Sequence, residues 1–342
     1  MPAGKKNSLT DVEGILVGHF TDAKAASGTS VVICPEGATA GVDVRGSAPG
    51  TRETDLLAPL NLVEKVQAVV LTGGSVYGLS TVDGVVRWLS KKGWGFPLEN
   101  NNVAPIVPAA ALFDLGGGES YIPSIGPDWG TQACINADNN EFPIGSTGAG
   151  TGAQSGGIKG GLGTASEVLD SGLTVATMVA VNSLGSVIDP ATGSPWEIRL
   201  ELAGEFGELG RKSVIMPMPP AAEVSRNTTI GIVATDAIMT KAQAQKIAQM
   251  AHDGMARAIR PSHTMFDGDT IFCLATNKRN LPDTPGFFAA PKAVAQNEIG
   301  RAAADCMARA IIRAILAATS LNNIIAFCDL RVRRVILLSK NG

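Results

Sequence analysis

The sequence is poor in the residues that build metal centres and disulfide frameworks. It has only three histidines, His19, His252 and His263, and none of them shares with a cysteine the spacing that is typical of a zinc site. Its five cysteines are widely separated and odd in number, which favours buried thiols in a reducing compartment over disulfides. We therefore predict a cytoplasmic protein that uses no metal and no other cofactor.

Blocks of one charge and long hydrophobic runs are also missing. Charged residues make up 17% of the chain and the formal net charge is −3, without a basic block that could follow a phosphate backbone. The most apolar helical stretch, 307–319, contains two arginines and is shorter than the ~20 residues needed to span a bilayer. Residues 1–6 lack the apolar core of a signal peptide. These absences exclude nucleic acid and a membrane as expected partners.

Glycine, by contrast, is abundant. The chain has 40 glycines among 342 residues, well above the average of ~7%, and they cluster in apolar surroundings that are typical of tight turns. The cluster at 148–153 matches a dinucleotide fingerprint, with Glu167 near the spacing of the acid that binds ribose. The polar segment 138–143 before it is a poor strand, and the glycines after it cannot begin a helix. We interpret this match as accidental.

The first two thirds of the chain contain two clear strand patterns. Residues 66–72 predict a strand that leads through two glycines into a helix over 76–89, which places Ser75 and Tyr77 at the carboxyl end of the strand. Residues 173–181 predict a buried strand that ends at Asn182, so its amide could project from the strand end. The stretch 100–157 reads as loops that could wall a cleft, with one short helix near 107–113.

The last third has a regular α/β pattern. A strand at 229–235 precedes a helix from about 240 to 259, which Thr240 would cap. A second strand at 270–276 precedes a long helix that opens at Pro291 and runs through 316. If the two strands are parallel, their starts lie side by side, as a connection through a helix allows. The 45% hydrophobic residues are enough for one large domain or two smaller ones.

The junction Asn227-Thr228-Thr229 joins a proline-rich, extended segment to the strand at 229–235. Three interpretations are open. An ordinary turn is the commonest on local sequence alone, and the same residues form a glycosylation sequon, which requires secretion. Cleavage before Thr228 is the third: the new α-amino group, with a pKa of about 7.7–8.0, could take the proton of the threonine hydroxyl.

The pair Asp267 and Asp269, one glycine apart, also has two interpretations. An Asp-Gly-Asp turn can simply end a loop before a strand. Alternatively, the carboxylates orient the hydroxyl and the ammonium group of Thr228, because such a nucleophile still needs a partner to fix its geometry.

Together these pieces resemble the DmpA-type self-processing N-terminal-nucleophile hydrolases, peptidase family P1. This group includes L-aminopeptidase/D-esterases, β-aminopeptidases and nylon-oligomer hydrolases. The resemblance runs from about residue 9 to 330. It rests on GILVGH at 14–19, VRGSAPGTRETDLL at 44–57, LTGGSVYGL at 71–79, GAGTG at 148–152, KGGLGTA at 159–165, Val181-Asn182 and the junction.

The resemblance implies a fold and a processing event. The fold is a four-layer αββα sandwich of DmpA type, one domain over residues 1–330. A precursor would cleave itself into chains 1–227 and 228–342 that stay together and associate as a homo-oligomer. Residues 331–342 lie beyond the resemblance, as a tail of unknown role.

The resemblance also implies roles at single positions. Thr228 matches the nucleophile and Asn227 the residue whose carbonyl it attacks. Asn182 matches an amide that donates to the oxyanion. Tyr77 matches a tyrosine in the oxyanion hole or against substrate. Asp267 and Asp269 match the nylon-hydrolase acid pair, and Lys159 falls near an active-site lysine of those enzymes, two residues beyond the glycine that alignment favours.

The implied activity is hydrolysis of amides in small peptides, amino-acid amides or 6-aminohexanoate oligomers through an acyl-enzyme on Thr228. The Asn-Thr junction is similar to nylon hydrolases, whereas the Lys-Gly-Gly segment at 159–161 is similar to aminopeptidases. No residue identifies the substrate. Two alternatives stay open: acyl transfer to an amine, as in self-cleaving acetyltransferases, and a glycine-rich binding protein that is never cleaved.

Overall fold

A computed structural model describes residues 1–217, 227–283 and 290–333. The main strands are β1 (Leu16–Asp22), β2 (Ser27–Val44), β3 (Gly50–Arg52), β4 (Lys65–Thr72), β7 (Ala109–Ala111), β10 (Gly161–Val168), β11 (Thr174–Val181), β12 (Ile230–Ala237) and β13 (Thr270–Arg279). The helices are α1 (Ser75–Gly78), α2 (Thr81–Lys91), α3 (Pro127–Ile135), α4 (Gly207–Gly210), α5 (Lys241–Ala258) and α6 (Ala293–Leu316). Two small hairpins are formed by β5 (Phe96–Pro97) with β6 (Val103–Ala104), and by β8 (Gln154–Ser155) with β9 (Ile158–Lys159).

One hydrogen-bonded sheet runs through the described residues in the order β10-β11-β12-β13-β2-β4-β7-β3, with β1 also on β2. The strand β2 joins its two halves. Residues 29–33 of β2 pair with β4, residues 39–44 pair with β13, and the register with β4 shifts between Ile33 and Ala38. Such an irregularity lets a long strand bend. The sheet therefore turns back over itself at β2.

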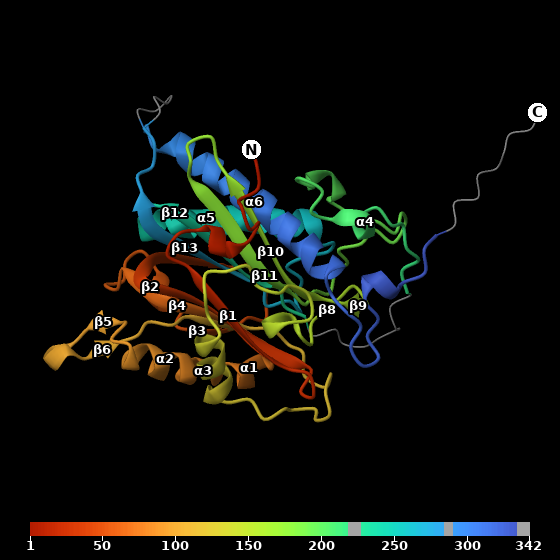
Figure 1. Ribbon diagram of the computed structural model, residues 1–342, viewed down its shortest axis with the longest axis horizontal. Helices are drawn as coiled ribbons and strands as arrows, with labels where there is room; N and C mark the ends of the chain where they lie inside the picture. Colours follow the sequence, from red (N-terminus) through yellow and green to blue (C-terminus); the bar gives the residue numbers. More distant parts are fainter. Residues whose placement is uncertain (218–226, 284–289, 334–342) are drawn as a thin grey trace, which may run out of the picture.

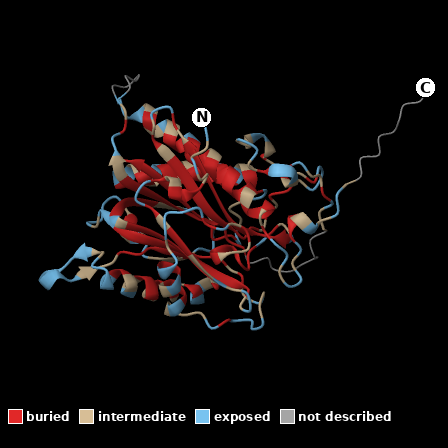
Figure 2. Cartoon of the chain, in the orientation of Figure 1, coloured by how far each residue is buried: buried red, intermediate tan, exposed pale blue. Residues whose placement is uncertain are grey.

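Alternating side chains divide the interior into three apolar layers. On β12, Val233 packs toward α5 and α6, whereas Ile232 faces the space between the two halves of the sheet. On β4, Leu71 enters that same central layer, whereas Val70 packs with α2 and α3. Helices thus cover both outer faces, and the buried strands lie between them (Figures 1 and 2). The mixed α/β, single-domain fold expected from the sequence is confirmed.

The elements of the last third form where the sequence places them. Thr240 caps α5, because its side chain accepts from the backbone N–H of Gln243 and the Gln243 side chain bonds back to Thr240, a complete capping box. The strand β13 and the long helix α6 follow, with α6 beginning at Ala293, just after Pro291. The strands β12 and β13 are parallel, as expected of a connection through a helix.

The region 100–157 differs from the expectation. The short helix near 107–113 is wrong: Ala109–Ala111 form β7, which pairs with both β4 and β3. Alanine favours helix locally, but the sheet supplies partners that a local pattern cannot reveal. The helix α3, opened by Pro127, was not predicted, and the helix expected over 76–89 is divided into α1 and α2.

No described helix is long and apolar enough to cross a membrane. The prolines of 218–226 and most of the tail, 334–342, fall outside the described residues.

Candidate active site

The junction lies at the start of two neighbouring parallel strands. Asn227 forms a parallel bridge with Asp267, directly before the pairing of Ile230 with Thr270 begins. The predicted proximity of the junction and the acid pair is therefore confirmed. Asn227 and Thr228 are buried, with exposed fractions of 7% and 4%. The order β12, α5, β13 brings residues 40 positions apart in sequence into contact here.

The Thr228 hydroxyl points at the carbonyl that self-cleavage would attack. Its Oγ1 donates to the Asn227 carbonyl oxygen at 2.5 Å and accepts from the backbone N–H of Gly268 at 3.2 Å. The backbone N–H of Thr228 donates to the Asn182 carbonyl oxygen at 2.5 Å. Three contacts therefore fix the peptide bond and the hydroxyl relative to each other.

The two carboxylates of the acid turn hold loops around the junction. Asp267 accepts from the backbone N–H and the hydroxyl of Thr264, at 2.9 and 2.6 Å. Asp269 accepts from the backbone N–H of Thr229 at 2.8 Å and from His263. Within the described residues neither carboxylate hydrogen-bonds to the Thr228 hydroxyl; Gly268, between them, does. Burial raises the pKa of Asp267, and the charge of Asp269 raises it further.

Asn182 reaches the junction from the end of β11. Its side-chain Oδ1 accepts from the backbone N–H of Gln154 at 2.9 Å, and its Nδ2 donates to the Phe113 carbonyl oxygen at 3.0 Å. An amide nitrogen carries two N–H groups, so the second N–H is not used by this contact. The side chain is 2% exposed and is clamped between two loops.

Those two loops are anchored by two buried ionisable side chains, Lys159 and Asp114. Lys159 Nζ donates to the carbonyl oxygens of Gly150, Ala153 and Gly160 at 2.9–3.0 Å. Asp114 accepts from the backbone N–H of Gly74 at 2.6 Å. Burial lowers the pKa of Lys159 to about 7, opposed by the charge of Asp114, whose own pKa burial raises to about 6. Lys159 thus holds the glycine loop and does not hydrogen-bond to Thr228.

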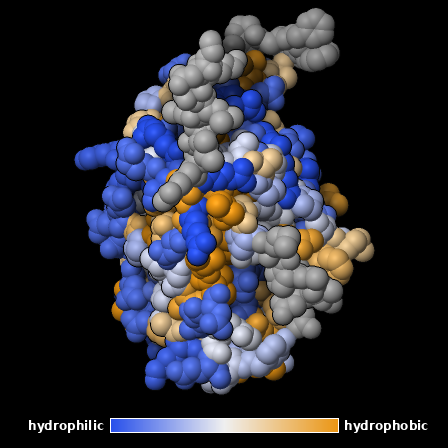
Figure 3. All heavy atoms as spheres, turned by 90° about the vertical axis from the view of Figure 1, so that its right-hand side faces the viewer, coloured by the Kyte–Doolittle hydropathy of each residue, from blue (hydrophilic) through white to orange (hydrophobic). Residues whose placement is uncertain are grey.

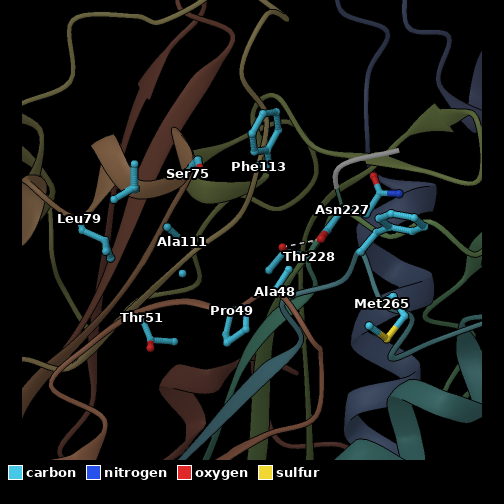
Figure 4. Close-up of a pocket in the computed structure, with 13 residues that line it drawn as sticks. Ala48, Pro49, Thr51, Ser75, Leu79, Ala111, Phe113, Asn227, Thr228 and Met265 are labelled. Atoms are coloured by element: carbon cyan, nitrogen blue, oxygen red, sulfur yellow. Dashed lines mark hydrogen bonds between the residues drawn. The ribbon is translucent and has the colours of Figure 1, made fainter. Parts of the chain in front are cut away.

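A pocket of about 490 Å³ opens in front of the Thr228 hydroxyl (Figure 4). Phe113, Ser75 and Leu79 lie on one side of it and Met265 on the other. The full lining is Ala48, Pro49, Gly50, Thr51, Ser75, Val76, Leu79, Ala111, Phe113, Asn227, Thr228, Met265 and Phe266. Apolar and small side chains predominate, with hydroxyls from threonine and serine. Hydrophobic surface also forms a central band on the face in Figure 3.

Tyr77 does not line this pocket. It belongs to the short helix α1, whose Ser75 and Val76 do, and it is 45% exposed. The structure thus brings Thr228, Asn227, Asn182 and the acid turn together, leaves Lys159 beneath the glycine loop and leaves Tyr77 beside the pocket.

Several residues of the site were missed in the sequence. Gly268 contacts the Thr228 hydroxyl through its backbone, and only its place between two acids could have pointed to it. His263 hydrogen-bonds to Asp269, but the histidines were considered only as metal ligands. The described residues contain no group of three His, Cys, Asp or Glu side chains placed to hold a metal ion.

Comparison with known proteins identifies the family of the chain. The model of "Peptidase family S58" matches residues 7–325. An uncharacterized aminopeptidase of Mycobacterium tuberculosis (strain ATCC 25618 / H37Rv) is 43% identical over 95% of this chain and 98% of its own. A 6-aminohexanoate-oligomer endohydrolase of Kocuria sp. (strain KY2) is 28% identical over 91% of this chain and 86% of its own.

A solved structure is similar in fold. The L-aminopeptidase D-Ala-esterase/amidase of Ochrobactrum anthropi, described as a variant of the Ntn-hydrolase fold, superimposes with a TM-score of 0.69 at 21% identity. The match covers 92% of this chain and 87% of that one. The resemblance to aminopeptidases and nylon-oligomer hydrolases is confirmed, whereas the label P1 is not: the chain belongs to peptidase family S58.

Proposed function

We propose that this amide hydrolase is made as a precursor that cleaves itself between Asn227 and Thr228, and that the freed Thr228 then hydrolyses amide bonds. One observation carries the proposal: the Thr228 hydroxyl lies 2.5 Å from the carbonyl oxygen of its own preceding peptide bond, at the wall of a pocket. The products would be chains 1–227 and 228–342, which remain associated because β11 and β12 are neighbours in the sheet.

Processing follows an N-to-O acyl shift. Thr228 Oγ1 attacks the carbonyl carbon of Asn227, the C–N bond breaks, and the nitrogen leaves as the amine of Thr228. Water then hydrolyses the resulting ester, which frees the hydroxyl and leaves a carboxylate on Asn227. The backbone N–H of Gly268 positions Oγ1, and the Asn182 carbonyl oxygen positions the nitrogen that becomes the amine.

Turnover uses the same groups. The free amine of Thr228 takes the hydroxyl proton, and Oγ1 attacks a substrate carbonyl carbon. The C–N bond of the substrate breaks, and its amine leaves with the proton that the Thr228 amine returns. Water then hydrolyses the acyl-enzyme ester, which releases the acid and frees the hydroxyl. The second N–H of Asn182 supplies a donor for the oxyanion. Asp267 and Asp269 act by holding the turn that carries Gly268, and Lys159 by holding the loop beside Asn182. In this proposal the half-exposed Tyr77, next to the pocket-lining Val76, contacts the part of a substrate that extends beyond the pocket.

The lining of the pocket suits small substrates that carry no bulky polar group. Its walls come mainly from Pro49, Leu79, Phe113 and Met265, which suits aliphatic acyl chains. Small peptides, amino-acid amides and 6-aminohexanoate oligomers fit this description, in line with the names of the related enzymes. The apolar band on the surface supports association of processed copies as a homo-oligomer.

The test compares the wild type with Thr228→Ala on amino-acid amides and 6-aminohexanoate oligomers, in plain buffer and with an added amine acceptor. The wild type should release free acid and amine, and Thr228→Ala should release neither. A product found only as an acylated acceptor would support the acyltransferase alternative. Full hydrolysis by Thr228→Ala would overturn the proposed nucleophile.

A further inference from the structure

Two of the three histidines lie directly behind the acid turn. His263 Nδ1 is 2.7 Å from Asp269 Oδ2, and the backbone N–H of His263 donates to the same oxygen at 3.0 Å. The ring of His252 packs edge-to-face on the ring of His263, with centroids 4.9 Å apart and an angle of 73°. Neither ring lines the pocket that holds the Thr228 hydroxyl.

The Asp269 carboxylate connects this pair to the junction. Its Oδ2 is held twice by His263, and its Oδ1 accepts from the backbone N–H of Thr229 at 2.8 Å. Thr229 directly follows the nucleophile. The backbone carbonyl oxygen of Asp269 accepts from the backbone N–H groups of Arg45 and Gly46 at 3.0 and 3.2 Å, which fixes the main chain. The rotation of the carboxylate therefore depends on its own hydrogen-bond partners.

The conformation of His263 is unusual for a residue with a side chain. Its φ is 57°, in the left-handed region that is costly for most residues and concentrates at functional sites. Its Nε2 is buried without a partner among the described residues. The bond from Nδ1 to Asp269 is therefore the hydrogen bond that the ring makes there.

His252 fixes the ring of His263 from the other side. It is buried in α5, and its Nε2 donates to the Asp43 carbonyl oxygen at 3.1 Å. Burial lowers the pKa of His252 to about 4, opposed by the bond to Asp43, so near neutral pH its ring is an uncharged packing surface. The contacts thus run in one line, from His252 through His263 and Asp269 to Thr229.

We propose that His263 is a positioning residue, which holds the Asp269 carboxylate so that its other oxygen keeps Thr229, and with it the Thr228 hydroxyl, against Gly268. Its role in the reaction rests on the function proposed above. Without the ring, Oδ2 keeps only the backbone N–H of His263, and the carboxylate can turn away from Thr229.

Two variants distinguish the hydrogen bond of the His263 ring to Asp269 from the packing of that ring. His263→Gly removes the ring, keeps the backbone N–H and relieves the left-handed strain. His263→Asn replaces Nδ1 with an amide donor at a similar distance from the backbone, and asparagine tolerates this conformation. Leu89→Ala, which opens a cavity under α2 in the apolar layer that contains Val82 and Val85, controls for lost stability, with thermal unfolding measured for all three.

Cleavage between residues 227 and 228 is followed in each variant, and amide exchange at Thr229 is followed in the same variants carrying Thr228→Ala. His263→Gly should slow cleavage about tenfold, as expected for a lost hydrogen bond to a charged group, and should speed exchange at Thr229. His263→Asn should restore both, and Leu89→Ala should change neither.

Unchanged exchange at Thr229 in His263→Gly would overturn the inference, as would failure of His263→Asn to restore it or an equal effect of Leu89→Ala. A wild-type chain that is never cleaved would instead overturn the proposed function. The exchange rate at Thr229 would then still decide whether His263 holds Asp269.

Discussion

The Thr228 hydroxyl is surrounded mainly by backbone groups. It contacts the Asn227 carbonyl and the Gly268 N–H, while the Thr228 N–H contacts the Asn182 carbonyl. The carboxylates of Asp267 and Asp269, which the sequence suggested as partners of the hydroxyl, do not hydrogen-bond to it in the described part of the chain. They hydrogen-bond to Thr264 and Thr229 beside the junction. A contact made by a backbone group leaves no trace in the identity of the side chain, which is why Gly268 was missed.

Gly268→Ala tests the backbone contact. An added Cβ would lie 2.6 Å from the Ala48 carbonyl oxygen and 2.9 Å from Thr228 Oγ1, so the turn must shift by several tenths of an ångström. We expect self-cleavage to slow by about 10²-fold, as misplacement of a reacting group does. Gly126→Ala, where an added Cβ meets nothing within 4 Å, should process normally. Equal rates in the two variants, measured by gel densitometry, would contradict this role.

Asp114→Asn tests the electrostatic effect of Asp114 on Lys159. The carboxylate raises the pKa of Lys159 against burial, which lowers it to about 7. Removing that charge should therefore lower the pKa of Lys159 below about 7. Titration of the lysine side chain by NMR measures the change. Asp236→Asn, another buried carboxylate that pairs with Arg279, should leave Lys159 unaffected; a pKa of Lys159 that rises or stays constant in Asp114→Asn would count against the pairing.

Whole elements were predictable where one local pattern decides them. The capping box of α5 and the apolar faces of β12 and β13 are visible in the sequence, and these elements form as expected. The short strand β7 has only three residues, and its partners β3 and β4 lie far away along the chain. Pairing over such distances decides its structure, so no local pattern could predict it.

The contact of α6 with the sheet depends on strand glycines. A Cβ added at Gly163 on β10 would lie 1.9 Å from the Ala310 carbonyl oxygen of α6, and helix backbone cannot yield. A Cβ added at Gly231 on β12 would meet the flexible end of Met307 at 2.9 Å. Gly163→Ala should therefore cost about 1–3 kcal/mol of unfolding free energy, and Gly231→Ala clearly less. Chemical denaturation of both variants measures these unfolding free energies. A larger loss in Gly231→Ala than in Gly163→Ala would contradict this packing.

At the scale of the whole molecule, buried histidines make stability depend on pH. Burial lowers the pKa of His19 and of His252 to about 4, whereas an unfolded histidine takes up its proton near pH 6.5. Their contribution is therefore present above about pH 6.5 and is lost as the pH falls toward about 4, because the unfolded chain binds more protons there.

His19→Gln should weaken that dependence by removing one of the two groups. Urea unfolding of the Thr228→Ala chain, with and without His19→Gln, is measured between pH 7 and pH 4.5. The opposite contribution of Asp114, whose pKa is raised to about 6, is common to both chains and cancels in the comparison. Identical slopes of unfolding free energy against pH would show that burial does not lower the pKa of His19 in the folded state.

The overall architecture was predictable because several motifs together identified a family, as single glycine motifs could not. The match over residues 7–325 bears this out. The arrangement of the site was not predictable to the same depth. Lys159 binds three loop carbonyls, and Tyr77 is half exposed beside the pocket; both outcomes depend on how distant loops meet.

The central claim is that the chain cuts itself before Thr228, and the most direct measurement is the intact mass of freshly purified and aged protein under denaturing conditions. The account predicts two chains that meet at Asn227 and Thr228, with threonine found at the new amino terminus by sequencing, and a single chain in Thr228→Ala. A wild-type chain of 35.2 kDa that stays whole while it hydrolyses amides would contradict the account.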